Sequence, residues 1–399
     1  MSLTYSQKSN PKRHQLVPDD ASLKRSDNGN IELAEKREPI TIEHLRERIQ
    51  QAIELEHSTI PPYLCALYSI KDGTNQVAAE IIRSVVIEEM LHMVMVANLL
   101  NAVGGKPIIG EKIKGKFTPD YPTELPGDVM PGFIVGLNDF SPATIREFEK
   151  IEHPEGGKQF YENDDNSQGS FGGIGEFYAA LIEDLEVLEK QAKSKGKTIF
   201  TGTVAQVTGE HYYGAGGKII NVRNLEDAKE LINEIVGQGE GTLGTIFSEP
   251  YDEDNDYQWF GPGVDEYAHY FRFKEIRYER FYAPTDSAHR DSPNKGLPTG
   301  EKFHVDWEAV HKFKPNPKLD NYEVGSDLYK KTLEFNETYM ALLNNINEAC
   351  NGNPEVLKTG IPLMYDLKYK AAELMNIPAG DNEYMAGPSF EFTNCPEQS

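Results

Sequence analysis

The segment VVIEEMLHMVMV, residues 85–96, constrains the fold more than any other part of the sequence. It is too apolar for a helix that faces solvent, yet it carries Glu88, Glu89 and His92. Ionised carboxylates are very costly to bury without partners, so each of them needs a cation, a hydrogen-bond network or a shifted pKa. The segment therefore predicts a core helix with a charged site built into it.

This core helix is predicted to be the second of two long amphipathic helices. The first should begin after Thr41, which has the side chain of a good N-cap, and the second should span about residues 76–102. A helix breaker at residues 71–74 separates them, and two long helices joined by a short turn pack antiparallel, as in the first half of a helical bundle. Glu56 is the one charged residue that lies on the apolar stripe of the first helix.

The rest of the chain predicts further helices separated by long irregular segments. A polar arm of residues 1–40 precedes the first helix, and a strand-plus-helix insertion of about residues 196–262 precedes the fourth. The remaining helices are predicted over about residues 142–151, 176–193, 264–282, 327–350 and 354–375. The predicted fold is mainly α: a four-helix bundle within residues 41–283, with long loops, a small α/β insertion and additional C-terminal helices in residues 284–399.

Composition and charge argue against several classes of protein. The 399 residues are 38% hydrophobic, enough for a large core, and the net charge of −24 disfavours binding to nucleic acid or to an anionic membrane surface. No apolar run reaches the ~18 residues that span a bilayer, and the first residues lack the apolar stretch of a secretory signal. Three widely spaced cysteines predict neither a disulfide framework nor a thiolate zinc site. We expect a soluble, acidic, cytoplasmic protein.

The spacing Glu-x-x-His places a carboxylate and an imidazole one turn apart on one face of a helix, where both can reach a single cation. With 42 Glu and 10 His in 399 residues, about one such pair is expected by chance, yet five occur. They are Glu54/His57, Glu89/His92, Glu266/His269, Glu301/His304 and Glu308/His311. The second and third pairs lie inside long apolar or aromatic helices and are the candidate ligands. The last two fall in a Pro-rich region typical of surface pairs, and the first is interpreted as lying one face away from the site.

A bundle of this kind would gather four carboxylates and two imidazoles in its interior. They are Glu56 from the first helix, Glu89 and His92 from the second, Glu176 from the third, and Glu266 and His269 from the fourth. Glu183 lies one heptad after Glu176 and is the alternative ligand from the third helix. Two divalent cations offset four negative charges, so the simplest occupant is a dinuclear metal centre. These ligand types suit iron and manganese and also accept zinc.

The motifs that carry these residues resemble those of a known superfamily. They are IELEHSTIPPYL, IEEMLHM, GGIGEFYAALIEDL and DEYAHYFRFKEI, within about residues 41–283. They are similar to the ferritin-like superfamily, and more narrowly to the ferritin-like domain of iminophenylpyruvate-dimer synthases of bisindole pigment pathways, which the closing AGPSFEF also fits. The resemblance implies a carboxylate-bridged di-iron centre, a tyrosine seven residues after the first ligand (Glu56 and Tyr63), and a small amino-acid-derived imine or related metabolite as substrate.

Several residues near the predicted ligands have two interpretations each. Glu88 could be solvated or could support a ligand from outside the centre, and basic residues between positions 272 and 277 could hold the fourth-helix pair in a salt-bridge network instead. Tyr63 could be a redox-active or hydrogen-bonding neighbour of the metals, or a core tyrosine. Pro61 and Pro62 remove two backbone donors from the first helix, which predicts either a packing bend or a wider cavity beside the metals.

Two functional hypotheses follow from these features. The first is an oxidoreductase that uses a di-iron or di-manganese centre to activate dioxygen or peroxide and acts on a small molecule, with Tyr63 as the candidate catalytic residue. The alternative is a non-catalytic ferritin-like metal-binding or scaffold protein. Iron storage is disfavoured because the long insertions would obstruct packing into a shell. Assembly into a homo-oligomer is compatible with either hypothesis.

Overall fold

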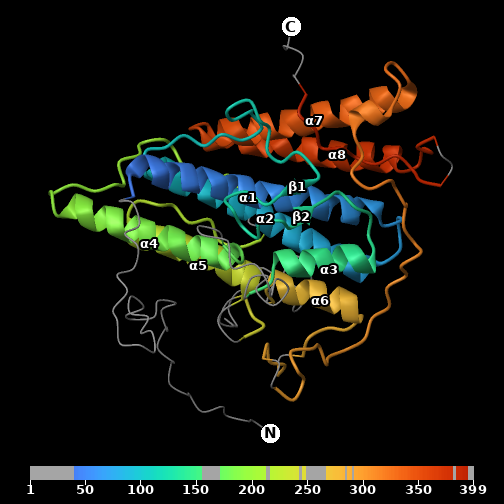
Figure 1. Ribbon diagram of the computed structural model, residues 1–399, viewed down its shortest axis with the longest axis horizontal. Coiled ribbons are helices and arrows are strands. Elements are labelled where there is room, and N and C mark those ends of the chain that lie inside the picture. The colour runs from blue at the N-terminus through green and yellow to red at the C-terminus, as the bar shows by residue number, and fades with distance from the viewer. Residues whose placement is uncertain are drawn as a thin grey trace, which may run out of the picture. The chain divides into compact units, whose positions relative to one another are not determined.

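The computed structural model describes residues 40–154, 171–212, 216–241, 245–248, 267–283, 285–289, 292–380 and 383–393. Residues 41–399 form one compact unit, and the predicted polar arm lies, apart from Ile40, outside the described residues. Among the residues described, the chain forms eight α-helices and one two-stranded sheet (Figure 1). The predicted mainly α fold with long loops is confirmed.

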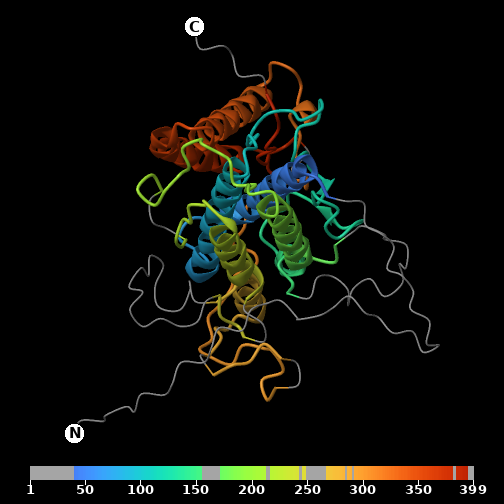
Figure 2. The same ribbon diagram turned by 90° about the vertical axis from the view of Figure 1, so that its left-hand side faces the viewer.

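The central pair of helices is the one that the sequence predicts. α1 spans Ile42–Ser69 and α2 spans Gln76–Ala102, and the two pack against each other (Figures 1 and 2). Thr41 is the N-cap of α1, because its hydroxyl accepts a hydrogen bond from the backbone N–H of His44 at 3.2 Å. The apolar stripes of both helices are buried, and they bring the anomalous acids into the interior with them.

Both prolines lie inside α1, and one of them creates a contact with a distant loop. Pro62 has no N–H to donate to the carbonyl of Ser58, four residues earlier. The hydroxyl of Tyr121, in the long loop between α2 and α3, donates to that carbonyl instead, at 2.7 Å. The acceptor that the proline leaves open is therefore used to fasten this loop to α1.

α2 is strongly apolar over most of its length. An 18-residue window of it has a mean hydropathy of 1.4, so in length and composition alone it could cross a membrane, although Glu88 and Glu89 interrupt the apolar run. Within the fold, however, 89% of that window is buried. Burial on all sides is what makes a core helix apolar all round, and α2 occupies that place in the bundle.

The other half of the bundle is built from four shorter helices. They are α3 (Pro142–Ile151), α4 (Ile174–Lys193), α5 (Leu225–Glu240) and α6 (His269–Tyr278). α4 packs against α5 and α3 packs against α6, with the two pairs placed toward opposite ends of the α1–α2 pair (Figure 1). α5, which the sequence placed in an insertion, thus packs as part of the bundle, and the described residues between 196 and 224 form no strand.

α6 is shorter than the predicted helix over residues 264–282. It begins at His269, because Ala268 has an extended backbone (φ −63°, ψ 154°) and Tyr267 pairs with Phe247 in an isolated β-bridge. It ends at Tyr278, where Glu279 turns into the left-handed region with φ 51°. That Glu266 and His269 share one helical face stays a prediction. Glu266 itself lies outside the described residues.

The C-terminal helices lie on the other side of the α1–α2 pair from α4 and α5 (Figure 1). α7 spans Asp327–Cys350, a 3-10 helix η3 spans Pro354–Gly360, and α8 spans Ile361–Leu374, close to the predicted ranges. A short 3-10 turn η2 (Leu319–Asn321) precedes them. The small sheet pairs β1 (Thr123–Glu124) with β2 (Ile134–Val135) in antiparallel fashion, with Thr123 opposite Val135.

One acid of α6 predicts a measurable dependence of stability on pH. Burial raises the pKa of Glu275 to about 8, even though its carboxylate accepts the backbone N–H of Tyr282 at 2.7 Å and lies near Arg272. Between its unfolded pKa of 4.5 and 8, the folded protein keeps a proton that the unfolded chain has released, so stability falls as pH rises through this window. Glu275→Gln keeps the acceptor and removes the ionisation. We expect it to reduce the loss of unfolding free energy between pH 5.5 and pH 8 by about 2–3 kcal/mol, measured by urea unfolding.

The matched control is Glu230→Gln, the same substitution at an acid on α5 whose side chain is 52% exposed. An identical pH dependence of wild type and Glu275→Gln would contradict the expected protonation of Glu275.

Candidate metal centre

Five buried side chains converge where α1 and α2 meet the end of α3 and the start of α6. Glu56 comes from α1, Glu89 and His92 from α2, Glu152 from the residue after α3, and His269 from the first residue of α6, and each is at most 4% exposed. They form two groups, Glu56/Glu89/His92 and Glu89/Glu152/His269, in which one ligand atom from every residue lies within 4.8 Å of the others. Glu89 belongs to both groups. Two such groups joined by a shared carboxylate match the ligand pattern of a dinuclear centre.

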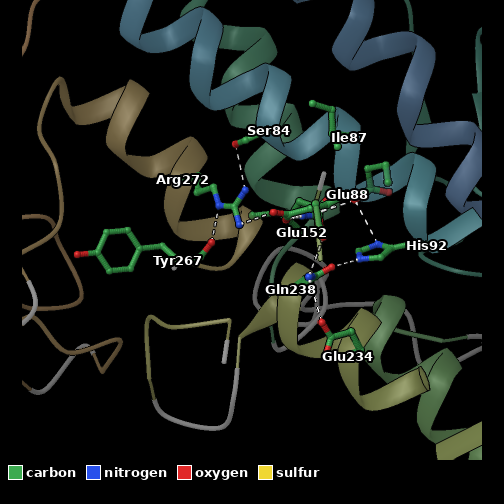
Figure 3. A network of polar contacts seen from close by, with 12 residues as sticks. Ser84, Ile87, Glu88, His92, Glu152, Glu234, Gln238, Tyr267 and Arg272 are labelled. Atoms are coloured by element: carbon green, nitrogen blue, oxygen red, sulfur yellow. Dashed lines mark hydrogen bonds and ion pairs between the residues drawn. The ribbon is translucent and has the colours of Figure 1, made fainter. Parts of the chain in front are cut away.

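His269 directs one ring nitrogen at the centre, and its other ring nitrogen contacts a supporting residue, the carboxylate of Glu88. Its Nδ1 lies 2.9 Å from Glu89 Oε1 and 3.5 Å from Glu152 Oε2, yet it makes no hydrogen bond of acceptable geometry. Its Nε2 lies 2.7 Å from Glu88, whose other oxygen is 3.0 Å from Nη2 of Arg272 (Figure 3). A carboxylate paired with arginine is an acceptor, so Nε2 carries a proton, and Nδ1 is the nitrogen that faces the centre.

His92 is oriented in the same way by a neutral support. Its Nδ1 lies 3.5 Å from Glu56 Oε2 and 3.9 Å from Glu89 Oε1. Its Nε2 lies 2.7 Å from the amide oxygen of Gln238, whose amide nitrogen donates to the carbonyl of Gly216 at 3.1 Å (Figure 3). Because a carbonyl can only accept, this contact fixes which end of the Gln238 amide is the donor. His92 Nε2 must then carry its proton, and Nδ1 is free to bind a cation.

Each of the three carboxylates accepts a hydroxyl hydrogen bond on one of its oxygens. The donors are Thr59 to Glu89 Oε2 at 2.7 Å, Tyr63 to Glu152 Oε1 at 2.5 Å, and Tyr178 to Glu56 Oε1. In all three residues the remaining oxygen is the one that faces an imidazole nitrogen. The hydroxyls therefore fix the carboxylates and leave one oxygen of each directed at the centre.

The crowding of buried acids raises the proton affinity of Glu89 and of His269. Burial and the charge of Glu152 raise the pKa of Glu89 to about 7. Burial alone would lower the pKa of His269, but the carboxylates of Glu152, Glu88 and Glu89 around its ring raise that pKa well above its ordinary value. Divalent cations bind deprotonated carboxylates and neutral imidazoles and would replace these protons. Nδ1 of His269 faces carboxylate oxygens without a hydrogen bond of acceptable geometry, and this arrangement fits a metal ion bound between them.

The structure brings together four of the six residues that the sequence proposed as ligands: Glu56, Glu89, His92 and His269. Tyr63 lies beside them as a hydrogen-bonding neighbour through Glu152. Of the remaining two, Glu266 falls outside the described residues, and Glu176 is not part of either group.

Glu176 is occupied by the start of its own helix. Its carboxylate accepts the backbone N–H of Gly172 at 2.8 Å, the usual role of an acid in the first turn of a helix. Glu183, the alternative, is exposed. Glu240, the last residue of α5, lies near Glu176: burial raises its pKa to about 8, with the charges of Glu152 and Glu176 adding to the effect.

Sequence analysis missed Glu152. It follows the last turn of α3 and has no histidine three residues away, so the Glu-x-x-His spacing does not select it. The available signal was an acid at the end of a short amphipathic helix whose apolar face, with Ile145, Phe148 and Ile151, is fully buried.

The remaining Glu-x-x-His pairs lie away from the centre. His57 faces the C-terminal helices, with its Nε2 2.6 Å from the hydroxyl of Tyr339 on α7. Glu301 and His304 are exposed, as predicted for a surface pair. Arg272 forms the ion pair with Glu88 described above, and Arg277 pairs with Glu149 at 2.8 Å, so these basic residues do contribute salt bridges at the border of the site.

A helical bundle with two linked groups of buried carboxylates and imidazoles defines a class of metal-binding helical proteins. A sequence model described as Ferritin-like matches residues 49–278, and the chain belongs to this family. Among solved structures, it is similar to a ferritin like protein from Caulobacter vibrioides, with 21% identity and a TM-score of 0.54, over 88% of this chain and 99% of that one. That likeness supports the fold. No curated protein matches the chain.

Proposed function

We propose that this Ferritin-like protein is a metal-dependent oxidoreductase. Its centre would contain two divalent ions, with iron as the first candidate, held by the five converging residues. The observation that carries the proposal is the sharing of Glu89 between two buried groups, each with one imidazole and two carboxylates. Glu88 is neutralised by Arg272 and adds no charge to the centre. Three carboxylates would offset three of the four positive charges of two divalent ions. The remaining charge suits an anionic substrate.

When bound, two such ions would supply the electron transfer that activates dioxygen or peroxide. The chain's own residues hold the ligands in place and exclude water. The hydroxyls of Tyr63 and Tyr178 donate to Glu152 and Glu56, one on each side of the centre. Tyr63 is our candidate catalytic residue, because its hydroxyl holds a proton at Oε1 of Glu152, a carboxylate that would bind one of the ions.

The substrate class follows from the same arguments. An amino-acid-derived imine or 2-oxo acid carries the carboxylate that the residual charge favours, and the motif resemblance to iminophenylpyruvate-dimer synthases points to the same class of molecule. We place the protein in the cytoplasm, where such metabolites are formed. A second copy of the chain is a compatible partner, whereas nucleic acid is not, because the net charge is −24.

Dioxygen uptake by protein loaded anaerobically with ferrous iron tests the proposal. We expect oxygen consumption in air that depends on the added amino-acid-derived imine or 2-oxo acid, and Tyr63→Phe should slow it without changing the iron content. Elemental analysis of the protein as purified without added metal, before iron is loaded, gives the metal identity.

The control is the loaded Glu301→Ala/His304→Ala variant, which loses an exposed pair of the same spacing and should consume oxygen like wild type. If the protein retains its iron but consumes dioxygen no faster in the presence of the substrate than in its absence, the non-catalytic metal-binding alternative is favoured.

A further inference from the structure

We propose that the two metal positions are unequal, and that Glu88 and Arg272 make the position containing His269 the one that binds a divalent ion first. This inference rests on the proposed metal centre but not on the oxidoreductase activity. Glu88 and Arg272 act through His269 and are positioning residues.

The two positions are closely matched in the residues that face the ions. Each has one imidazole that presents Nδ1, and both share Glu89. Each has one further carboxylate with an oxygen held by a tyrosine hydroxyl: Glu56 with Tyr178, and Glu152 with Tyr63. A difference in affinity must therefore come from outside this set.

The support behind His269 is a buried ion pair. Glu88 lies 2.7 Å from His269 Nε2 and 3.0 Å from Arg272 Nη2. Arg272 is 0% exposed and is itself fixed, because it also donates to Ser84 Oγ at 3.0 Å and to the carbonyl of Tyr267 at 2.5 Å (Figure 3). The imidazole of His269 is thus held by an ionised carboxylate that is paired with a fixed guanidinium.

The support behind His92 has the same geometry but lacks the charge. Gln238 lies 2.7 Å from His92 Nε2 and is held by Gly216 at 3.1 Å and by Glu234 at 3.3 Å (Figure 3). Its amide oxygen orients the ring as well as a carboxylate would. Because the amide is neutral, however, it increases the electron density on the ligating Nδ1 of His92 less than an ionised carboxylate would.

A carboxylate on the far nitrogen of a ligating histidine makes the imidazole a stronger donor, and loss of such a partner typically lowers metal affinity by about 10–100-fold. An amide supplies the orientation with less of the electronic effect. The position with His269, Glu152 and Glu89 should therefore fill first, and the position with His92, Glu56 and Glu89 second.

Titration of the metal-free protein with Co²⁺ against a chelator of known affinity tests this order. We expect two steps in the visible absorption of wild type, separated by about 10-fold or more in affinity. His92→Ala should retain the tight step and lose the weak one, and His269→Ala should do the reverse. Cobalt absorption reports the ligand environment directly, so the readout is independent of turnover.

Two variants remove the supports one at a time. Glu88→Gln/Arg272→Met removes both charges of the buried pair together, and it should weaken the tight step by about 10-fold or more while the weak step stays within about 3-fold. Gln238→Met removes the neutral support and should weaken the weak step alone. Because Gln238→Met leaves the ion pair intact, it keeps the inference testable even if the double variant does not fold, which circular dichroism would reveal.

The outcomes separate this inference from the proposed function. Wild type that binds no cobalt at all would overturn the metal centre itself. Two ions bound with equal affinity would overturn only the inequality, as would a folded Glu88→Gln/Arg272→Met protein in which the tight step is unchanged or both steps weaken alike.

Discussion

Protein carrying Glu89→Ala and His92→Ala is expected to lose both metal ions, from about two per chain to less than one. Glu89 is the residue common to both groups, so its removal leaves each position with two protein ligands, and loss of His92 takes a further ligand from one of them. Divalent iron, manganese or zinc bound by so few side chains should be removed by a weak chelator. Elemental analysis after gel filtration measures the stoichiometry.

The control for this experiment is again Glu301→Ala/His304→Ala, which removes the same two residue types at the same spacing from an exposed site. It should retain the wild-type metal content. If the Glu89 and His92 variant retained it as well, the assignment of these two residues as ligands would be wrong.

Arg272→Met is expected to destabilise the metal-free protein by about 3–5 kcal/mol, because it removes the main counter-charge of the buried Glu88 carboxylate. Glu88 is 2% exposed, so solvent cannot take the place of the guanidinium. The free energy of unfolding in urea, with chelator present in every sample, measures the effect. Arg223→Met is the matched control, since this arginine pairs with Asp227 at 3.2 Å with its side chain 80% exposed and should contribute at most about 1 kcal/mol.

The double variant Glu88→Gln/Arg272→Met should recover a substantial part of this loss, because neither charge is then left alone in the interior. A single variant as stable as wild type, or a double variant no better than the single, would show that the ion pair is not the source of the stability.

The central helices were predictable because their signals are local and agree with one another. Thr41 caps α1 as predicted, and the span 76–102 of α2 is the observed one. The apolar periodicity shows which face of each helix is buried. Glu56, Glu89 and His92 lie on that face, so they could be found from sequence. The C-terminal helices follow from the same kind of signal.

The rest of the site is harder to predict because it lies at helix ends. Glu152 follows the last residue of α3 and His269 is the first residue of α6, so neither position is set by the spacing of a long helix. His269 was selected through its Glu-x-x-His spacing to Glu266, which lies outside the described residues. Glu176 was proposed from the resemblance of the third-helix motif, and its carboxylate accepts the backbone N–H of Gly172 instead.

The concentration of Glu88, Glu89 and His92 on α2 also determines where the chain can change in length. Inserting one residue between Glu89 and His92 would rotate everything beyond it by about 100° and would separate two ligands of the same position. The cost of a longer connection between two helices grows only with the logarithm of its length. A change of chain length is therefore tolerated far better between helices than inside α2.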